Sequence, residues 1–399
     1  MDTNPRSSSQ RPRHEVADIL RAHAEAYGER HVVRPDQWKA IRAIIACRTA
    51  VLGGHMDRCL DCATEKQPSY NSCLNRHCPK CQGPSGFTWV EARKEWLLPV
   101  GYFHCVFTLP VELRAVAQRN EALVYSLIFR AASETLLTLG HDPKRYGALL
   151  GITAVLHTWK RDLEYHPHVH CIVTGGGLRR QTDQWVSARG DFLFPVKVMG
   201  ALFAGKVIAG LRHAYSRKRL EMPTEHATQS LFDALVRSLH AKSWVVYAKK
   251  PFGGPEQVLK YLGQYTHRVG ISNHRILDVT SDQVTLATRD GKTAQMSPSE
   301  FIRRFIRHIL PKGFVKIRHY GLWAAGNRLQ FEKAIAILAP PSDKLVSPNP
   351  STDIEPTSEP IAEPWVCPNC GGCRLERRRL APLSRLAYPP RSLIPGPSG

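Results

Sequence analysis

The sequence lacks any apolar run of the roughly 18 residues that a membrane span requires. Residues 1–13 are polar and lack the hydrophobic segment of a secretory signal. Internal repeats are also missing, which argues against a solenoid or a propeller. These absences predict a protein of the cytoplasm with no membrane partner.

Acidic residues are scarce as well. The 399 residues include 34 Asp and Glu against 55 Lys and Arg, a formal net charge of +21. This excess is larger than solubility alone requires and favours a polyanionic partner, with nucleic acid as the first candidate.

Cysteine, in contrast, is plentiful, and in a reducing compartment 11 cysteines favour metal binding over disulfides. Two CxxC pairs separated by fifteen residues predict one tetrahedral structural Zn²⁺ site, with the ligands Cys59, Cys62, Cys78 and Cys81. Possible additional ligands are Cys73, His77 and His55. The later run Cys367, Cys370 and Cys373 has no fourth thiol nearby, so it is only a weak metal signal.

The hydrophobic pattern predicts an α+β fold with a central antiparallel sheet covered by helices. Strands are expected at 102–108, 151–157, 169–173 and 244–248, and long helices at 120–139 and 196–213. We divide the chain into a disordered segment 1–13, a helical and zinc-binding domain 14–98, a catalytic domain 99–338, and a Pro-rich linker with a disordered basic tail, 339–399.

The most informative stretch is a short apolar strand that contains two histidines. His168 and His170 alternate with Val169, so both imidazoles point to one face of the strand. Two neighbouring imidazoles form half of a divalent metal site, although paired structural histidines are the alternative. A third ligand is needed: His157 is slightly preferred, and Glu164, Gln257 and Gln264 remain open.

A second stretch, 256–268, predicts a helix with two tyrosines on one face. Tyr261 and Tyr265 are separated by four residues. An aromatic core stripe is the alternative, but the flanking Lys260, His267 and Arg268 make a dry face improbable. A tyrosine held near a metal can attack a phosphodiester as a covalent nucleophile.

Basic residues interleaved with aromatics follow in the helix and strand near 301–323. A solvated charged surface is the ordinary interpretation, whereas stacking of bases on the rings favours single-stranded nucleic acid. The predicted DNA-binding residues are Lys260, His267, Arg268, Arg303, Arg304 and Arg318.

Several motifs in this chain match a known family. They include residues 70–82 around Cys73 and Cys78, residues 102–110, the histidine strand 166–170, and the tyrosine stretch 261–268. The chain resembles the rolling-circle, two-tyrosine transposases of the insertion-sequence ninety-one family, which have a histidine-hydrophobic-histidine (HUH) endonuclease-like fold. The resemblance covers most of residues 16–328.

That resemblance implies metal-dependent nicking and strand transfer of single-stranded DNA at the ends and targets of a mobile element. It assigns the catalytic Mg²⁺ or Mn²⁺ to His168 and His170, the nucleophilic role to Tyr261 and Tyr265, and structural Zn²⁺ to the N-terminal cysteines. It also implies a bacterial cytosolic, nucleoid-associated protein; the oligomeric state is open. Two alternatives are a plasmid replication initiator or relaxase-like nickase, and a zinc-dependent DNA-binding regulator without catalysis.

Overall fold

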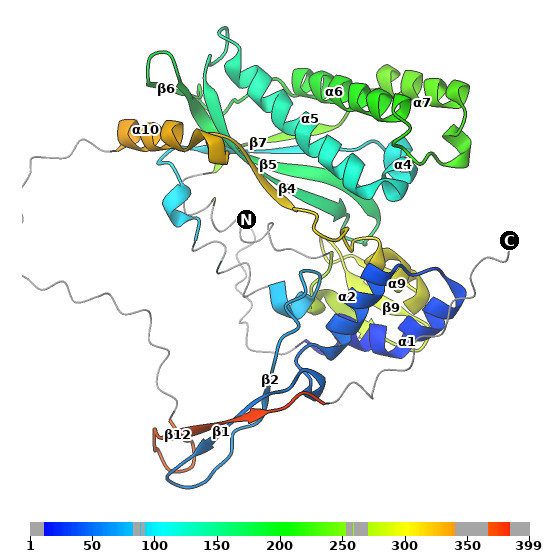
Figure 1. The fold of residues 1–399 in the computed structure, drawn as a ribbon, viewed down its shortest axis with the longest axis vertical. Helices are drawn as coiled ribbons and strands as arrows, with labels where there is room; N and C mark the ends of the chain where they lie inside the picture. The colour runs from blue at the N-terminus through cyan, green and yellow to red at the C-terminus, as the bar shows by residue number, and fades with distance from the viewer. Residues whose placement is uncertain are drawn as a thin grey trace, which may run out of the picture.

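A computed structural model describes residues 12–82, 92–252, 270–339 and 366–383, together with Thr88 and Val258. The fold is α+β, as the sequence predicts, and its largest part is an antiparallel sheet with the strand order β11-β4-β5-β3-β7 (Figure 1). The strands are β3 (Tyr102–Thr108), β4 (Leu149–Trp159), β5 (Tyr165–Arg179), β7 (Val246–Phe252) and β11 (Ile317–Gly321), and β6 (Gln184–Ser187) pairs with the end of β5.

Helices cover one face of this sheet. Alternate apolar residues of the central strands, such as Val169 and Cys171 on β5, point into the core that these helices complete. The helices are α4 (Arg114–Arg119), α5 (Glu121–His141), α6 (Val196–Ser216) and α7 (Gln229–Ala241). Within the described residues α5 alone is long and apolar enough to cross a membrane, and its burial in the core accounts for that composition.

The opposite face of the sheet, here called the imidazole face, contains polar side chains and a smaller apolar cluster. Tyr102 and Ile172 form this cluster with Trp323 and Val258. Next to it, α10 (Arg328–Leu338) packs Ala334 against Leu178 and Leu322. Most of the imidazole face is therefore free of covering helices among the described residues.

A second core lies beside the sheet. The N-terminal helices α1 (Val16–Arg30) and α2 (Pro35–Ala46) pack on α9 (Pro298–Ile306) and on the small sheet β8 (Ile276–Val279), β9 (Val284–Ala287) and β10 (Thr293–Met296). Ser297 caps α9 by accepting a hydrogen bond from the Glu300 N–H. The core thus joins 16–47 to 271–309, whereas we expected them in separate domains.

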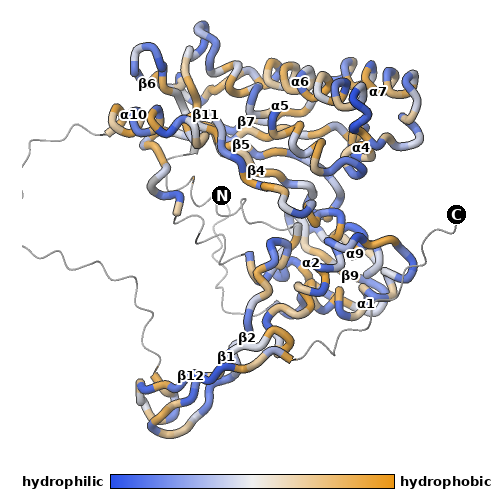
Figure 2. The backbone as a smooth tube through the Cα atoms, in the orientation of Figure 1, coloured by the Kyte–Doolittle hydropathy of each residue, from blue (hydrophilic) through white to orange (hydrophobic). Residues whose placement is uncertain are grey.

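The third part is a narrow ribbon that projects away from both cores (Figure 1). Its strand β1 (Gly54–Cys59) pairs with β2 (Ser69–Tyr70) and, over six residues, with β12 (Leu375–Leu380). In Figure 2 the strand β12, which contains Glu376–Arg379, is more hydrophilic than α5. The prediction of a disordered basic tail at the end of 339–399 is therefore wrong for 374–383, because β1 supplies a pairing partner that the local sequence does not reveal.

Single 3-10 turns complete the described structure: Ala50–Leu52, Lys94–Trp96, Val111–Leu113, Thr224–His226, Asn273–Arg275 and Ala325–Asn327.

Candidate active site and cysteine clusters

Three imidazoles converge on the imidazole face. His168 and His170 project from β5, and His157 on β4 lies opposite His168 in the strand register. One ring nitrogen from each residue lies within 4.8 Å of the others. We call these three residues the imidazole triad. Strand alternation explains the pair on β5, and the antiparallel register adds the third.

Hydrogen bonds orient two of these rings. The Nδ1 of His168 lies 2.7 Å from the carbonyl oxygen of His166, so Nδ1–H donates and the lone pair of Nε2 remains for a cation. The Nδ1 of His170 lies 2.8 Å from Nε2 of His104 on β3. Burial lowers the pKa of His168 to about 4, so this ring is neutral at neutral pH, as a metal ligand must be.

We did not identify His104 as part of this site from the sequence. His104 is buried, and this burial lowers its pKa to about 3. The positive charge of the nearby Lys249 also lowers the pKa, by a smaller amount. The sequence did place His104 in a predicted strand, 102–108, and that strand pairs with β5. The contact of His104 with His170 depends on the register of this pairing, which the sequence does not give.

Of the other proposed third ligands, Glu164 is engaged elsewhere. Its carboxylate pairs with Lys160 at 2.7 Å, and that hydrogen bond lowers the pKa of Glu164. Gln257 and Gln264 lie outside the described residues. His157 is thus the candidate that the structure brings to the histidine pair.

The triad opens into a cleft of about 690 Å³ between the sheet and the β9–β10 hairpin. Arg275 and Arg161 fasten the hairpin, since Arg275 donates to the carbonyls of Ala287 and Arg161. Arg289 and Lys292 are exposed at the hairpin turn and line the cleft. We call this space the basic cleft; its cations and imidazoles suit a polyanion close to a metal.

The predicted nucleophiles Tyr261 and Tyr265 lie outside the described residues, as do Lys260, His267 and Arg268. Their neighbour Val258 is described and is fully buried. It packs in the apolar cluster with Ile172, which is two residues beyond His170 on the same face of β5. The chain therefore passes over the imidazole face three residues before Tyr261.

The remaining predicted DNA-binding arginines have partners within the protein. Arg303 and Arg304 both pair with Glu300. Arg318 on β11 lies opposite Ala154, a residue of the helix-covered core, and it donates to the Ser126 hydroxyl on α5. Arg318 is thus on the far side of the sheet from the imidazole triad, and DNA binding by these residues remains a prediction.

The cysteines form two clusters instead of the single site that we predicted. In the first, the Sγ atom of Cys81 lies 3.5 Å from that of Cys47 and 3.6 Å from that of Cys73. We call it the core cysteine cluster; its members are Cys47, Cys73, Cys78 and Cys81.

In the second, the Sγ atoms of Cys59 and Cys370 lie 3.6 Å apart, as do those of Cys62 and Cys367. We call it the ribbon cysteine cluster; its members are Cys59, Cys62, Cys367 and Cys370. The predicted grouping of Cys59 and Cys62 with Cys78 and Cys81 is therefore wrong. A CxxC pair identifies two ligands of a site, but it does not identify the cysteines that complete the site. Because Cys59 ends β1, it and Cys62 lie in the ribbon, away from Cys78 and Cys81.

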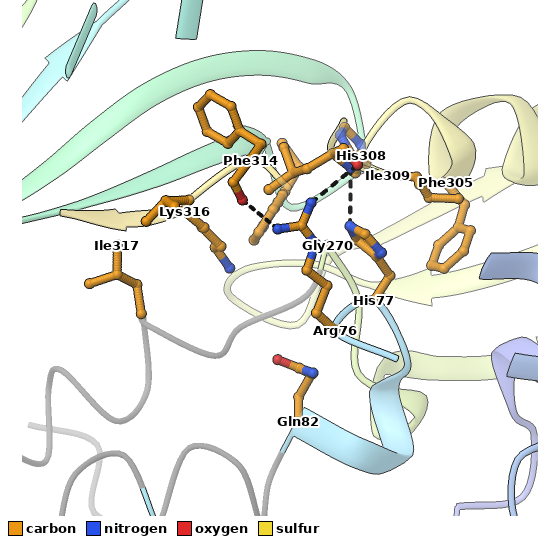
Figure 3. A pocket seen from close by; sticks show the side chains of 13 residues that line it. Arg76, His77, Gln82, Gly270, Phe305, His308, Ile309, Phe314, Lys316 and Ile317 are labelled. Carbon is orange, nitrogen blue, oxygen red and sulfur yellow. Dashed lines mark hydrogen bonds between the residues drawn. The ribbon is translucent and has the colours of Figure 1, made fainter. Parts of the chain in front are cut away.

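His77, a possible additional ligand in our prediction, has a different role. Its Nε2 accepts a hydrogen bond from the Leu310 N–H at 3.0 Å, and burial lowers its pKa to about 3. The adjacent Arg76 donates to the carbonyls of Leu310, Pro311 and Phe314. Figure 3 shows both side chains directed toward the 305–317 segment, around a cavity of about 290 Å³. The core cysteine cluster is thus joined to the segment that leads into β11.

This sequence matches two family models and two named relatives. Residues 151–330 match the family model Y2_Tnp, described as "Putative transposase", and residues 19–109 match Zn_Tnp_IS91, described as "Transposase zinc-binding domain". A relative named "Putative transposase y4qJ" from Sinorhizobium fredii is 43% identical over 329 residues, which is 80% of this chain and 82% of the relative.

A second relative is the transposase for insertion sequence element IS801 from Pseudomonas savastanoi pv. phaseolicola. It is 25% identical over 365 residues, covering 85% of this chain and 83% of the relative. No solved structure matches.

Proposed function

This chain belongs to the IS91-family transposases, and from that premise we propose that it nicks and transfers single-stranded DNA through a 5′-phosphotyrosine intermediate. The proposal assigns the nucleophilic role to Tyr261 and Tyr265 and metal binding to the imidazole triad. Its DNA substrates would be the ends of the mobile element and the target.

The observation that carries the proposal is the convergence of the triad on the face where Val258 is buried. Three residues of extended chain span at most about 11 Å, so the backbone of Tyr261 lies within about 11 Å of the backbone of Val258. A placement of Val258 under the helices on the other face would have been incompatible with a tyrosine attacking at the triad.

The donor set suits a divalent transition metal. Three imidazole ligands favour Mn²⁺ over Mg²⁺, because Mg²⁺ prefers oxygen ligands. His157, His168 and His170 would hold the ion, with His166 and His104 orienting two of the rings. When bound, the ion supplies Lewis-acid polarisation of the scissile phosphate.

The covalent step transfers one phosphorus–oxygen bond. The phenolate of one tyrosine, Tyr261 or Tyr265, attacks the phosphorus, the bond from phosphorus to the 3′ oxygen breaks, and that oxygen takes a proton to become a free 3′-hydroxyl. The 5′ end remains linked to the tyrosine. In the reverse step a 3′-hydroxyl attacks the phosphotyrosine, so rejoining needs no ATP. The other tyrosine of the pair allows a second strand to be held at the same time.

The basic cleft gives the strand a path to this site. Arg289 and Lys292 extend from the hairpin turn where phosphates can reach them. Each contact releases counterions from DNA, so we expect binding to weaken steeply with salt. The hairpin would hold the strand while the triad aligns one phosphate.

A nicking assay tests this function. Labelled single-stranded DNA from an element end is incubated with the full chain and Mn²⁺, and the expected product is a denaturant-resistant protein–DNA adduct with a free 3′-hydroxyl. The double variant Tyr261→Phe/Tyr265→Phe should give no adduct, and His170→Ala should reduce adduct formation at least 100-fold. The matched control Tyr215→Phe removes a hydroxyl from α6, where the ring stacks on Phe232, and should leave the adduct unchanged.

The outcomes separate the alternatives. A protein that binds this DNA but forms no adduct with any metal would be a zinc-dependent regulator, and the proposal would be wrong. Cleavage restricted to a plasmid origin, with no reaction at element ends, would indicate a replication initiator or relaxase-like nickase.

A further inference from the structure

We propose that the ribbon cysteine cluster is a second zinc site, separate from the core cysteine cluster, that joins the C-terminal strand to the N-terminal module. The matched zinc-binding model covers residues 19–109 and the transposase model covers 151–330, so neither range contains Cys367 or Cys370. Half of the ligand set therefore lies outside both matches.

The sulfur separations fit zinc. Four thiolates at a Zn–S distance of about 2.3 Å in a tetrahedron are about 3.8 Å from one another. The sulfur atoms here lie 3.6 Å apart, both for Cys59 with Cys370 and for Cys62 with Cys367. A disulfide requires about 2.05 Å, so these thiols are arranged around a common centre and not as bonded pairs.

The backbone repeats one turn on both sides of the cluster. On β1, the Cys59 N–H donates to the carbonyl of Thr64, and the Ala63 N–H donates to the carbonyl of Cys59, both at 2.9 Å. In the C-terminal segment, the Cys367 N–H donates to Gly372 and the Gly371 N–H donates to Cys367, also at 2.9 Å.

The dihedral angles repeat as well. The residue after the second cysteine has a left-handed backbone in both turns, with φ of 60° at Ala63 and 72° at Gly371. Two such CxxC knuckles facing each other supply the four thiolates that a closed structural site needs. The core cysteine cluster has no equivalent pair, because the chain is helical from Pro79 to Gln82, within its CxxC pair.

The ribbon also needs a stabilising interaction beyond its strand pairing. The ladder between β1 and β12 is six residues long, and Arg377–Arg379 of β12 are exposed. A strand pair with so little apolar burial is marginal in water. Two ion pairs align the strands: Arg374 with Asp61, and Arg377 with the buried Asp57, to which it donates two hydrogen bonds; neither pair adds apolar burial. Binding of a metal by thiolates from the turn after β1 and the turn before β12 would make the ribbon stable.

Close contact between the two turns supports the same arrangement. A Cβ atom added at Gly372 would lie 2.1 Å from the Asp61 carboxylate. Gly372 and Asp61 therefore pack against each other in a way that no other residue type at 372 permits without displacement. The chain brings together turns that are 305 residues apart, between Cys62 and Cys367.

The test counts thiolate-bound zinc in the full chain. Protein purified without chelator is titrated with a mercurial thiol reagent, and the released zinc is measured with a colorimetric indicator; this count excludes metal held by histidines alone. We expect two zinc ions per chain. Cys367→Ser and Cys370→Ser should each reduce the count to one, while the matched control Cys373→Ser should keep two, since Cys373 is exposed and lies outside the cluster.

A second measurement distinguishes loss of the site from general misfolding. Iodoacetamide labelling read by mass spectrometry should show Cys59 and Cys62 becoming at least tenfold more reactive in Cys367→Ser, with Cys78 and Cys81 still protected. One zinc per wild-type chain would overturn the proposal. So would two zinc ions retained in both Cys367→Ser and Cys370→Ser.

Discussion

The two cysteine clusters each have four thiols at nearly the same sulfur spacing, yet they occupy very different surroundings. The core cysteine cluster takes its members from residues 47–81, and Cys78 and Cys81 are packed in the second hydrophobic core. The ribbon cysteine cluster joins segments more than 300 residues apart on a projecting ribbon with little apolar burial. One cluster is therefore integral to a packed core, whereas the other fastens a peripheral strand.

The largest expected difference is in global stability. Metal binding by four thiolates supplies on the order of 10 kcal/mol to a folded site, and the core cluster shares its cysteines with a packed core. Cys78→Ser should therefore unfold the N-terminal helices and leave little soluble protein, as judged by circular dichroism and thermal unfolding. Cys370→Ser should change the melting temperature of the main body by only a few degrees, and equal losses in both variants would contradict the comparison.

Lys316 should make the free energy of unfolding depend on pH. Burial, and then the nearby guanidinium of Arg76, lower the pKa of Lys316 to about 7. Between about pH 7 and 10.5 the folded protein thus binds fewer protons than the unfolded chain, so raising the pH stabilises the fold. The free energy of unfolding should rise by up to about 1.4 kcal/mol per pH unit.

Urea unfolding from pH 7 to 9 measures this slope, and Lys316→Met should flatten it. Lys316→Arg offers a matched control, since a guanidinium stays charged across this range and should also remove the slope while lowering stability. An unchanged slope in Lys316→Met would show that another group titrates. Iodoacetamide labelling of Cys370 in the ribbon should be the same in the wild type and in both Lys316 variants.

A smaller effect is expected from the contact between the core cysteine cluster and the segment before β11. Arg76 donates to three backbone carbonyls, so Arg76→Ala should lower the free energy of unfolding by about 2 kcal/mol. Arg378→Ala on the ribbon removes the same side chain from an exposed position and should stay within about 0.5 kcal/mol. Chemical denaturation of both variants provides the measurement.

The sequence was most informative where the signal was local. The alternation around Val169 correctly places His168 and His170 on one face, and the hairpin at 284–296 forms with its turn at Asp290 and Gly291. Ser297, followed by Glu300 three positions later, caps the helix that it precedes. In each of these cases, residues within a few positions determine the conformation.

The failures involve partners far apart in the chain. The pairing of Cys59 with Cys370, and the contact of His104 with His170, depend on strand registers that no local pattern encodes. Arg318 shows the sensitivity of such predictions: its neighbour His319 contacts Thr153 on the imidazole face, while Arg318 itself faces α5. The roles of Tyr261 and Tyr265 stay predictions.

The distance between the two halves of the ribbon cysteine cluster has a consequence for synthesis of the protein. A ribosome adds about 5–20 residues per second, so the 305 residues from Cys62 to Cys367 take roughly 15 to 60 s to translate. During that interval Cys59 and Cys62 are outside the ribosome without their partners, while the core cysteine cluster can already assemble. A message that terminates early would produce a protein whose N-terminal ribbon never closes.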